Sequence, residues 1–181
     1  MSYTIVDPCV LDLTTHSTGH VYIITKNRNV ILGHDKKYDH IGSFGGFGDP
    51  DETLLQTILR EWDEESHGSI MDKETLVKYL KTGKIIMHSS PKGQHYTFFC
   101  KIDDLEFDIK DINTKFADSI SKPDLKEDQL EHDYIVMVSL DDIKEALAKG
   151  DDKIKNSFGK VEKIRNINIS CYNFFFANFD K

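Results

Sequence analysis

Apolar residues recur at helical spacing between residues 54 and 62. They fall three and four positions apart, which is the period of a helix that buries one face: Leu54, Leu55, Ile58, Leu59 and Trp62. Asp49 or Asp51 suits the N-cap, because a short carboxylate accepts hydrogen bonds from the free N–H groups of a first turn. Pro50 suits the first helical position, and Glu52 completes a pattern similar to a capping box. The sequence therefore predicts an amphipathic helix that begins near residue 50.

Further apolar runs predict strands on both sides of this helix. Val21–Thr25 and Asn29–His34 flank a three-residue turn, so we expect a hairpin. Other strands are predicted at Tyr3–Val6, Lys84–His88, His95–Ile102 and 131–140, and other helices at Lys73–Lys81 and Asp141–Lys149. The aromatic end of the chain, 172–179, is expected to pack as a final helix or strand. Residues 103–129 are acidic and irregular, and an insertion of this kind either carries specificity or is a tolerated surface excursion.

The composition is that of an ordinary soluble protein. The chain has 181 residues, of which 39% are hydrophobic and 30% are charged, and this length suits one domain with a substantial core. The formal charge of −8 argues against a broad nucleic-acid-binding surface. Three distant cysteines form no metal spacing or disulfide framework, the N-terminus lacks the basic start of a signal peptide, and no apolar run approaches the ~20 residues of a membrane span. We therefore expect a cytoplasmic protein without a membrane partner.

Three carboxylates form a cluster on the predicted helix. Glu61, Glu64 and Glu65 stand at positions i, i+3 and i+4, so their side chains are neighbours on one helix face. At ~100° per residue, this face runs along the edge of the apolar stripe and not opposite it. Clustered carboxylates repel one another, and a hard cation such as Mg²⁺ relieves the repulsion and commonly bridges to phosphates. Taken alone, the spacing is more typical of a solvated helix face, so the wider pattern has to decide.

The wider spacing resembles the Nudix box. Gly46 is followed after five residues by Glu52, and after seven more by the run Arg-Glu-Trp-Asp-Glu-Glu at 60–65. The family pattern is Gly, five residues, Glu, seven residues, Arg-Glu, an apolar residue, any residue, Glu-Glu, any residue, Gly, and every position from Gly46 to Glu65 matches it. The departure is at the end, where His67 replaces the closing glycine and Gly68 follows one place later. For this reason we expect the helix to end one residue late.

The resemblance implies a fold, a reaction and a site. The implied fold is α/β, a Nudix-type α/β/α sandwich around a mixed β-sheet, built by residues 1–181 as a single domain with the box at 46–68 and extra segments at about 70–83 and 103–129. The implied reaction is hydrolysis of a diphosphate linkage in a nucleotide-type substrate by water attack on phosphorus, with Mg²⁺ or Mn²⁺ as cofactor.

The resemblance also assigns roles to residues of this chain. The implied metal ligands are Glu61, Glu64 and Glu65, with Arg60 and Glu52 orienting them, and one of these glutamates or Glu131 takes the proton of the attacking water. Backbone groups of Gly45 and Gly46 shape the phosphate cradle. The implied catalytic set is Arg60, Glu61, Glu64, Glu65 and Glu131, and the implied substrate-binding set is Gly45, Gly46 and Glu52.

Three functions stay open on the sequence alone. The first is a small-molecule pyrophosphohydrolase acting on a nucleotide or another diphosphate, such as a diphosphoinositol phosphate. The second is an mRNA decapping enzyme of the same family, which would need a cap pocket and a path for capped RNA, and which the acidic charge disfavours. The third is a non-catalytic Nudix-fold module that binds a nucleotide, which the intact carboxylate set disfavours. The aromatic C-terminal segment also leaves a homodimer contact open.

Overall fold

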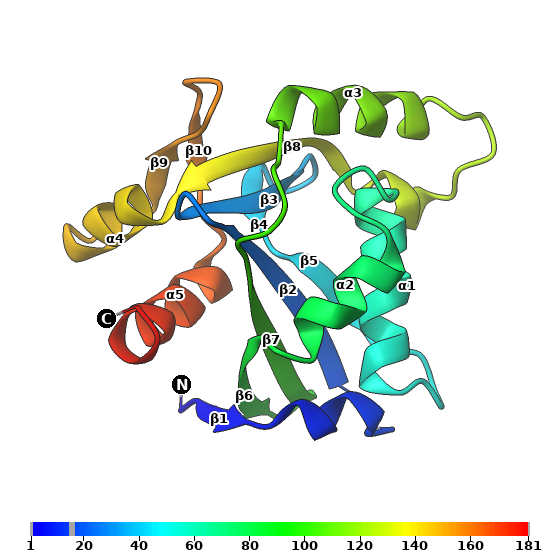
Figure 1. The fold of residues 1–181 in the computed structure, drawn as a ribbon, viewed down its shortest axis with the longest axis vertical. Helices are drawn as coiled ribbons and strands as arrows, with labels where there is room; N and C mark the ends of the chain where they lie inside the picture. The colour runs from blue at the N-terminus through cyan, green and yellow to red at the C-terminus, as the bar shows by residue number, and fades with distance from the viewer. Residues whose placement is uncertain (1, 15–16, 181) are drawn as a thin grey trace.

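An eight-stranded mixed sheet forms the centre of the part of the chain that the structure describes, residues 2–14 and 17–180 (Figure 1). These coordinates are a computed structural model. The strands of the sheet are β1 (Thr4–Val6), β2 (Ser17–Thr25), β3 (Asn29–Asp35), β4 (His40–Gly42), β5 (Phe44–Phe47), β6 (Lys84–Ser90), β7 (Gly93–Ile102) and β8 (His132–Ser139). A separate small hairpin is formed by β9 (Lys153–Lys155) and β10 (Val161–Lys163).

Strand β2 joins the two halves of the sheet. It pairs in parallel with β7 along its whole length, and β6 and β1 extend the sheet beyond β7. On its other edge, the first half of β2 pairs with β5 and its last residues pair with β3, both antiparallel. Strand β3 in turn pairs with β4 and, along its full length, with β8. The sheet is therefore mixed, as predicted.

Helices cover both faces of the sheet (Figure 1). They are α1 (Leu54–Ser66), α2 (Lys73–Leu80), α3 (Ile109–Ile120), α4 (Leu140–Ala148) and α5 (Asn166–Asn178), with short 3-10 turns η1 (Pro8–Asp12) and η2 (Glu127–Leu130). Val21 and Ile23 of β2 belong to the core beneath α1, whereas Tyr22 and Ile24 belong to the core beneath α4 and α5. Both faces of β2 are buried, so its central run 21–24 is apolar at every position and not alternating. The predicted α/β architecture, with helices on both sides of a mixed sheet, is confirmed.

Most predicted elements are present with shifted ends. The hairpin of β2 and β3, the edge strand β1, the helices α2 and α4, and the helical packing of the aromatic C-terminus all appear. The glycine-rich stretch 38–48, for which no strand was predicted, contains strands β4 and β5. Within the described residues, no helix has both the length and the apolar character needed to cross a bilayer.

The prediction for the start of the box helix is wrong. Neither Asp49 nor Asp51 is the cap, because the helix begins at Leu54 with Thr53 as N-cap. The Thr53 hydroxyl accepts from the Gln56 N–H at 3.2 Å, and the Gln56 side chain accepts from the Thr53 N–H at 2.7 Å. This reciprocal pair is a complete capping box, so the helix begins later than either predicted cap allows.

The prediction for residues 103–129 also needs correction, since this segment contains the helix α3. Asp108 caps it, and Ile112 and Phe116 face the core one turn apart. The Asn113 side chain pairs with the edge of β8, donating to the Ile135 carbonyl at 2.7 Å and accepting from the Ile135 N–H at 2.9 Å. The insertion is therefore packed into the fold and bonded to the sheet.

The pairing of β2 with β5 requires glycine at position 45. Gly45 has φ of +136°, and a Cβ there would lie 1.9 Å from the Gly19 carbonyl oxygen. We expect Gly45→Ala to lower the free energy of unfolding by ~3 kcal/mol or more, because it adds both backbone strain and a clash with the neighbouring strand. Gly150→Ala is the matched control, since Gly150 has φ of +72° and open space around its Cβ position.

Denaturant unfolding of both variants provides the measurement. The control should lose only about 1–2 kcal/mol, the conformational cost of a left-handed residue. Equal losses in the two variants would show that close approach of β2 and β5 is not what the glycine provides.

Candidate active site

Burial of one face of α1 fixes the direction of its polar side chains. Leu54, Ile58 and Trp62 are each 1% exposed, and the Trp62 indole N–H donates to the Met71 carbonyl at 3.1 Å. Anchored in this way, the helix directs Glu61 and Glu65 toward β5. The carboxylates lie at the edge of the buried stripe, where the sequence predicted them.

Arg60 gathers the acidic side chains around one guanidinium group. Its Nη1 donates to Glu61 Oε1 at 2.8 Å and to Glu64 Oε2 at 2.9 Å. Its Nε donates to Glu52 Oε1 at 3.0 Å, and its Nη2 donates to the Phe47 carbonyl at 2.8 Å. The five N–H groups of a guanidinium have a fixed planar geometry, so Arg60 sets the relative positions of three carboxylates and the end of β5.

Glu52 is held outside the helix, in the turn that precedes it. Its Oε2 accepts from the Asp49 N–H at 3.0 Å and from the Thr57 hydroxyl at 3.1 Å, in addition to Arg60. Burial acts to raise the pKa of Glu52, but the hydrogen bonds from Arg60, Asp49 and Thr57 outweigh it, and the pKa is lowered. Glu52 is thus an ionised residue that supports Arg60 from the side away from the other carboxylates.

Glu65 is the most buried carboxylate of the cluster. The residue is 7% exposed, and its Oε2 accepts from the Gly45 backbone N–H at 2.5 Å. Burial, followed by the negative charge of Glu61, raises the pKa of Glu65 well above its ordinary value. Burial is also the main cause that raises the pKa of Glu61, with Glu64 and Glu131 adding to it. The cluster therefore carries negative charge that the protein alone does not fully compensate.

Gly46 gives Glu61 room beside the strand. A Cβ at this position would lie 2.5 Å from Glu61 Oε2 and 2.6 Å from its Cδ. The two glycines of the predicted phosphate cradle thus also accommodate carboxylates: the Gly45 N–H donates to Glu65, and Gly46 lets Glu61 approach the backbone.

Glu131 reaches the same site from a distant part of the chain. It lies between η2 and β8, and its carbonyl accepts from the Lys36 N–H at 3.2 Å. Glu61, Glu65 and Glu131 line one pocket of about 440 Å³, together with both glycines. The structure therefore brings together the predicted residues Gly45, Gly46, Glu61, Glu65 and Glu131, while Glu64 and Glu52 are held next to them by Arg60.

The end of α1 differs from the expectation. The helix ends at Ser66, and His67 adopts the left-handed conformation with φ of +50°, so the helix does not run one residue late. His67 occupies the position of the closing box glycine and takes the backbone geometry that glycine favours there. Its Nε2 lies 2.8 Å from the Gln129 carbonyl oxygen, and its ring lies 5.6 Å from that of Phe116. His67 therefore ties the end of α1 to the segment that carries Glu131.

The carboxylate oxygens of this cluster are chemically suited to a hard divalent cation, although the described side chains do not converge on one point. In the described ranges 2–14 and 17–180, no three His, Cys, Asp or Glu side chains stand close enough together to hold an ion. The guanidinium of Arg60 bonds oxygens of Glu61 and Glu64, which explains why these carboxylates do not converge on one point. Carboxylate oxygens are nevertheless the ligands that Mg²⁺ and Mn²⁺ prefer, and excess negative charge favours their binding.

Sequence analysis did not identify the basic residues of this pocket. Lys92, His95 and Arg165 line it together with the carboxylates, as does Phe47. Neither Lys92 nor Arg165 has an acidic partner within 4.0 Å among the residues described. These side chains come from the β6–β7 turn and from the residue before α5, so only the folded sheet brings them together.

Neutralising Glu65 should stabilise the metal-free protein at neutral pH. Because the pKa of Glu65 is raised on folding, the native state retains its proton to a higher pH than the unfolded chain does. The resulting contribution to the free energy of unfolding falls as pH rises above the ordinary value of 4.5. Glu65→Gln removes this contribution, so its melting temperature in EDTA should exceed that of the parent increasingly from pH 5 to pH 8.

Asp63→Asn serves as the control for that comparison. Asp63 is an exposed carboxylate on the same helix and lies 2.9 Å from the Lys73 ammonium. The difference in melting temperature from the parent should widen with pH for Glu65→Gln and not for Asp63→Asn. A parallel shift in both variants would mean that net charge, and not the burial of Glu65, controls the difference.

The solved structures to which this chain is similar include three described below. No protein-family model matches the chain, and neither does any curated protein sequence. A hydrolase of the Nudix family from Clostridium perfringens is 13% identical, with a TM-score of 0.45 over 92% of this chain and 99% of that one. The MutT protein from Methanosarcina mazei Go1 is 13% identical, with a TM-score of 0.49 over 92% and 96%.

The third structure is a binary complex of an Ap4A hydrolase from C. elegans, which is 15% identical, with a TM-score of 0.46 over 90% of this chain and 99% of that one. The function of this chain therefore has to be argued from its own residues.

Proposed function

We propose that this protein is a metal-dependent pyrophosphohydrolase of the Nudix type, which cleaves a diphosphate linkage in a nucleotide-type substrate by water attack on phosphorus. The observation that carries the proposal is a pocket lined both by Glu61, Glu65 and Glu131 and by the basic residues Lys92 and Arg165. The carboxylates suit cations and the basic side chains suit phosphate oxygens, so the pocket holds both kinds of group that a metal-bound diphosphate needs.

Glu61, Glu64 and Glu65 are the proposed ligands of Mg²⁺ or Mn²⁺. Such an ion, when bound, polarises phosphoryl oxygens and lowers the pKa of water. Arg60 and Glu52 orient the three ligands, because the guanidinium bonds Glu61, Glu64 and Glu52 at 2.8–3.0 Å. Ligands fixed in this way lose little conformational freedom when an ion binds.

The other residues of the pocket are assigned to the substrate and to proton transfer. Lys92 and Arg165 bind phosphate oxygens, Arg165 in the bidentate manner that suits a guanidinium. Gly45 and Gly46 let the diphosphate approach the backbone of β5. Glu131 is the candidate base that accepts the proton of the attacking water, since it lines the same pocket, is close enough to Glu61 and Glu65 to raise their pKa values, and lies outside the helix that supplies the metal ligands.

Hydrolysis should require a divalent metal and Glu64. Assayed on a panel of nucleoside diphosphates and triphosphates, nucleotide sugars, dinucleoside polyphosphates and diphosphoinositol phosphates, the parent should release phosphate products with Mg²⁺ or Mn²⁺ and lose this activity in EDTA. Glu64→Gln keeps the size of the side chain and removes a charged ligand, so turnover should fall by about two orders of magnitude or more.

Asp63→Asn is again the neighbouring control and should retain parental turnover. Metal titration and melting temperature, measured for each variant, separate loss of the ion from loss of folding. Full activity in Glu64→Gln, or activity that survives thorough chelation, would overturn the proposed metal mechanism.

His67 should act on turnover through the position of Glu131. His67→Gly keeps the left-handed backbone but removes the contact with the Gln129 carbonyl. We expect kcat to fall by about tenfold, with KM for the substrate nearly unchanged, because only the base is displaced. His67→Gln is the companion variant, which retains a side chain able to donate to that carbonyl. A merely structural role would instead lower the melting temperature and leave kcat unchanged.

A further inference from the structure

A row of side chains crosses the sheet where the carboxylate pocket reaches β7. The register places Phe47 of β5 opposite Thr18 of β2, Thr18 beside His95 of β7, and His95 opposite His88 of β6. Cross-strand partners share one face of a sheet, so the four side chains follow one another in a line. Phe47, Thr18 and His95 also line the pocket of about 440 Å³. The rings of Phe47 and His95 are called the aromatic corner below.

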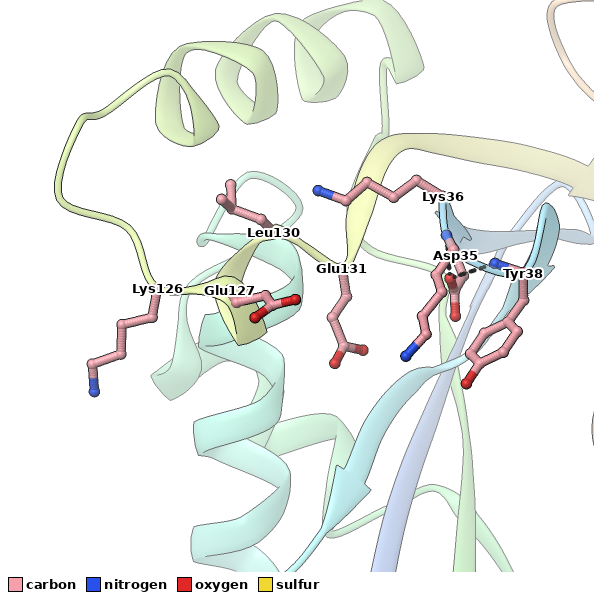
Figure 2. Close-up of a pocket in the computed structure, with 8 residues that line it drawn as sticks. Asp35, Lys36, Tyr38, Lys126, Glu127, Leu130 and Glu131 are labelled. Carbon is pink, nitrogen blue, oxygen red and sulfur yellow. Dashed lines mark hydrogen bonds between the residues drawn. The ribbon is translucent and has the colours of Figure 1, made fainter.

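The aromatic corner lies across β2 from Glu131. Glu131 precedes β8, which pairs with β3, whereas His95 lies on β7, beyond β2. Figure 2 shows the Glu131 carboxylate pointing into the space beside α1. A substrate whose phosphates lie among the carboxylates can therefore extend its remaining part over β2 toward β7.

Hydrogen bonds hold the ring of His95 in one orientation. Its Nδ1 lies 2.7 Å from the Thr18 hydroxyl oxygen, and its Nε2 lies 2.7 Å from the Ser90 hydroxyl oxygen. The ring also stacks on His88, with 4.5 Å between the centroids and 11° between the planes. Because both nitrogens are bonded within the protein, His95 meets a ligand with the carbon atoms of its ring.

Phe47 supplies an exposed ring beside His95. The residue is 57% exposed, and its ring lies 6.3 Å from that of His95, with 73° between the planes. Its backbone is fixed to α1, since its carbonyl accepts from Arg60 Nη2 at 2.8 Å. Single exposed aromatic residues are common on protein surfaces, but Phe47 lines the same pocket as Glu61 and Arg165. It is thus placed to stack with a planar group that is attached to phosphate.

Lys92 adds positive charge next to the aromatic corner. The Ser90 hydroxyl accepts from the Lys92 N–H at 3.1 Å and so fixes the turn between β6 and β7. Lys92 lines the pocket together with His95. An ammonium group on a flexible stem attracts phosphate without a preferred geometry, so Lys92 favours an anionic ligand but does not read the edge of a ring.

We propose that the aromatic corner binds the ring of the substrate through stacking on Phe47, without distinguishing one nucleobase from another. This inference rests on the function proposed above. Discrimination between bases requires donors and acceptors directed at the edge of the ring, but the hydrogen-bonding atoms of Thr18, Ser90 and His95 are bonded to one another. Stacking tolerates every base, because each has a π-face. Phe47 is therefore the residue that selects ligands with a ring over ligands without one.

Equilibrium binding in EDTA tests the aromatic corner without any catalysis. Calorimetry compares AMP, GMP, CMP and UMP, which carry different rings, with ribose 5-phosphate, which carries no base. In the parent, the four nucleotides should have Kd values within about fivefold of one another. The Kd of ribose 5-phosphate should be higher than that of AMP by about tenfold or more, because the stacking contact is missing. Phe47→Ala should bind AMP as weakly as ribose 5-phosphate.

Phe158→Ala is the matched control. Phe158 is 50% exposed, but it belongs to the turn between β9 and β10 and not to the pocket, so this variant should bind AMP as the parent does. Phe47→Trp should restore nucleotide binding, because indole also stacks with a base. Melting temperatures of all three variants show whether a change in affinity reflects a loss of folding.

The outcomes separate this proposal from the proposed function. Nucleotide binding that depends on Phe47 supports the aromatic corner even in a protein that hydrolyses nothing. Metal-dependent hydrolysis of a nucleotide with the same KM in the parent and in Phe47→Ala leaves the proposed function standing and overturns the aromatic corner. Absence of AMP binding by the parent, or equal Kd values for AMP and ribose 5-phosphate, overturns it as well. Kd values of the four nucleotides that differ by more than about fivefold overturn recognition by stacking alone.

Discussion

The guanidinium of Arg60 is the interaction on which the site depends. Carboxylates that share a helix face repel one another, and a site made only of acids would splay apart without a cation. Arg60 supplies a permanent positive charge on the helix itself and bonds Glu52, Glu61 and Glu64. Since it also donates to the Phe47 carbonyl, it links the acids to the strand that forms the floor of the pocket. The site can therefore be assembled before any ion arrives.

The sheet supports this arrangement by bringing backbone unusually close to the acids. Glycine at positions 45 and 46 removes the side chains that would collide with Gly19 and with Glu61. Glu65 accepts a hydrogen bond from the Gly45 N–H, but the same position buries its carboxylate, and burial raises the pKa of Glu65. The protein thus carries an electrostatic cost within its metal-free fold, and the binding of a cation would offset that cost.

The sequence predicts the placement of the α1 carboxylates better than it predicts the elements around them. The positions of Glu61, Glu64 and Glu65 beside a buried stripe follow from helical periodicity, because residues on one helix are related by fixed geometry. Lys92 and Arg165 could not be found in this way, since they are 73 residues apart along the chain and meet only across the folded sheet. The cap at Thr53 was not predicted because the side chains of Asp49 and Asp51 can also cap a helix. Only the structure shows at which residue the backbone becomes helical. The helix α3 did have a signal, namely Asp108 as a cap followed by Ile112 and Phe116, but it was outweighed by the acidic composition.

The side-chain amide of Asn113 covers part of the outer edge of the sheet at β8. An outer strand offers unpaired N–H and C=O groups to any other extended chain, including another copy of the same protein. Here one side chain of an inserted helix imitates a neighbouring strand and satisfies both groups of Ile135. The insertion between β7 and β8 thereby protects the protein against edge-to-edge association, so shortening it would expose a surface on which chains can stack.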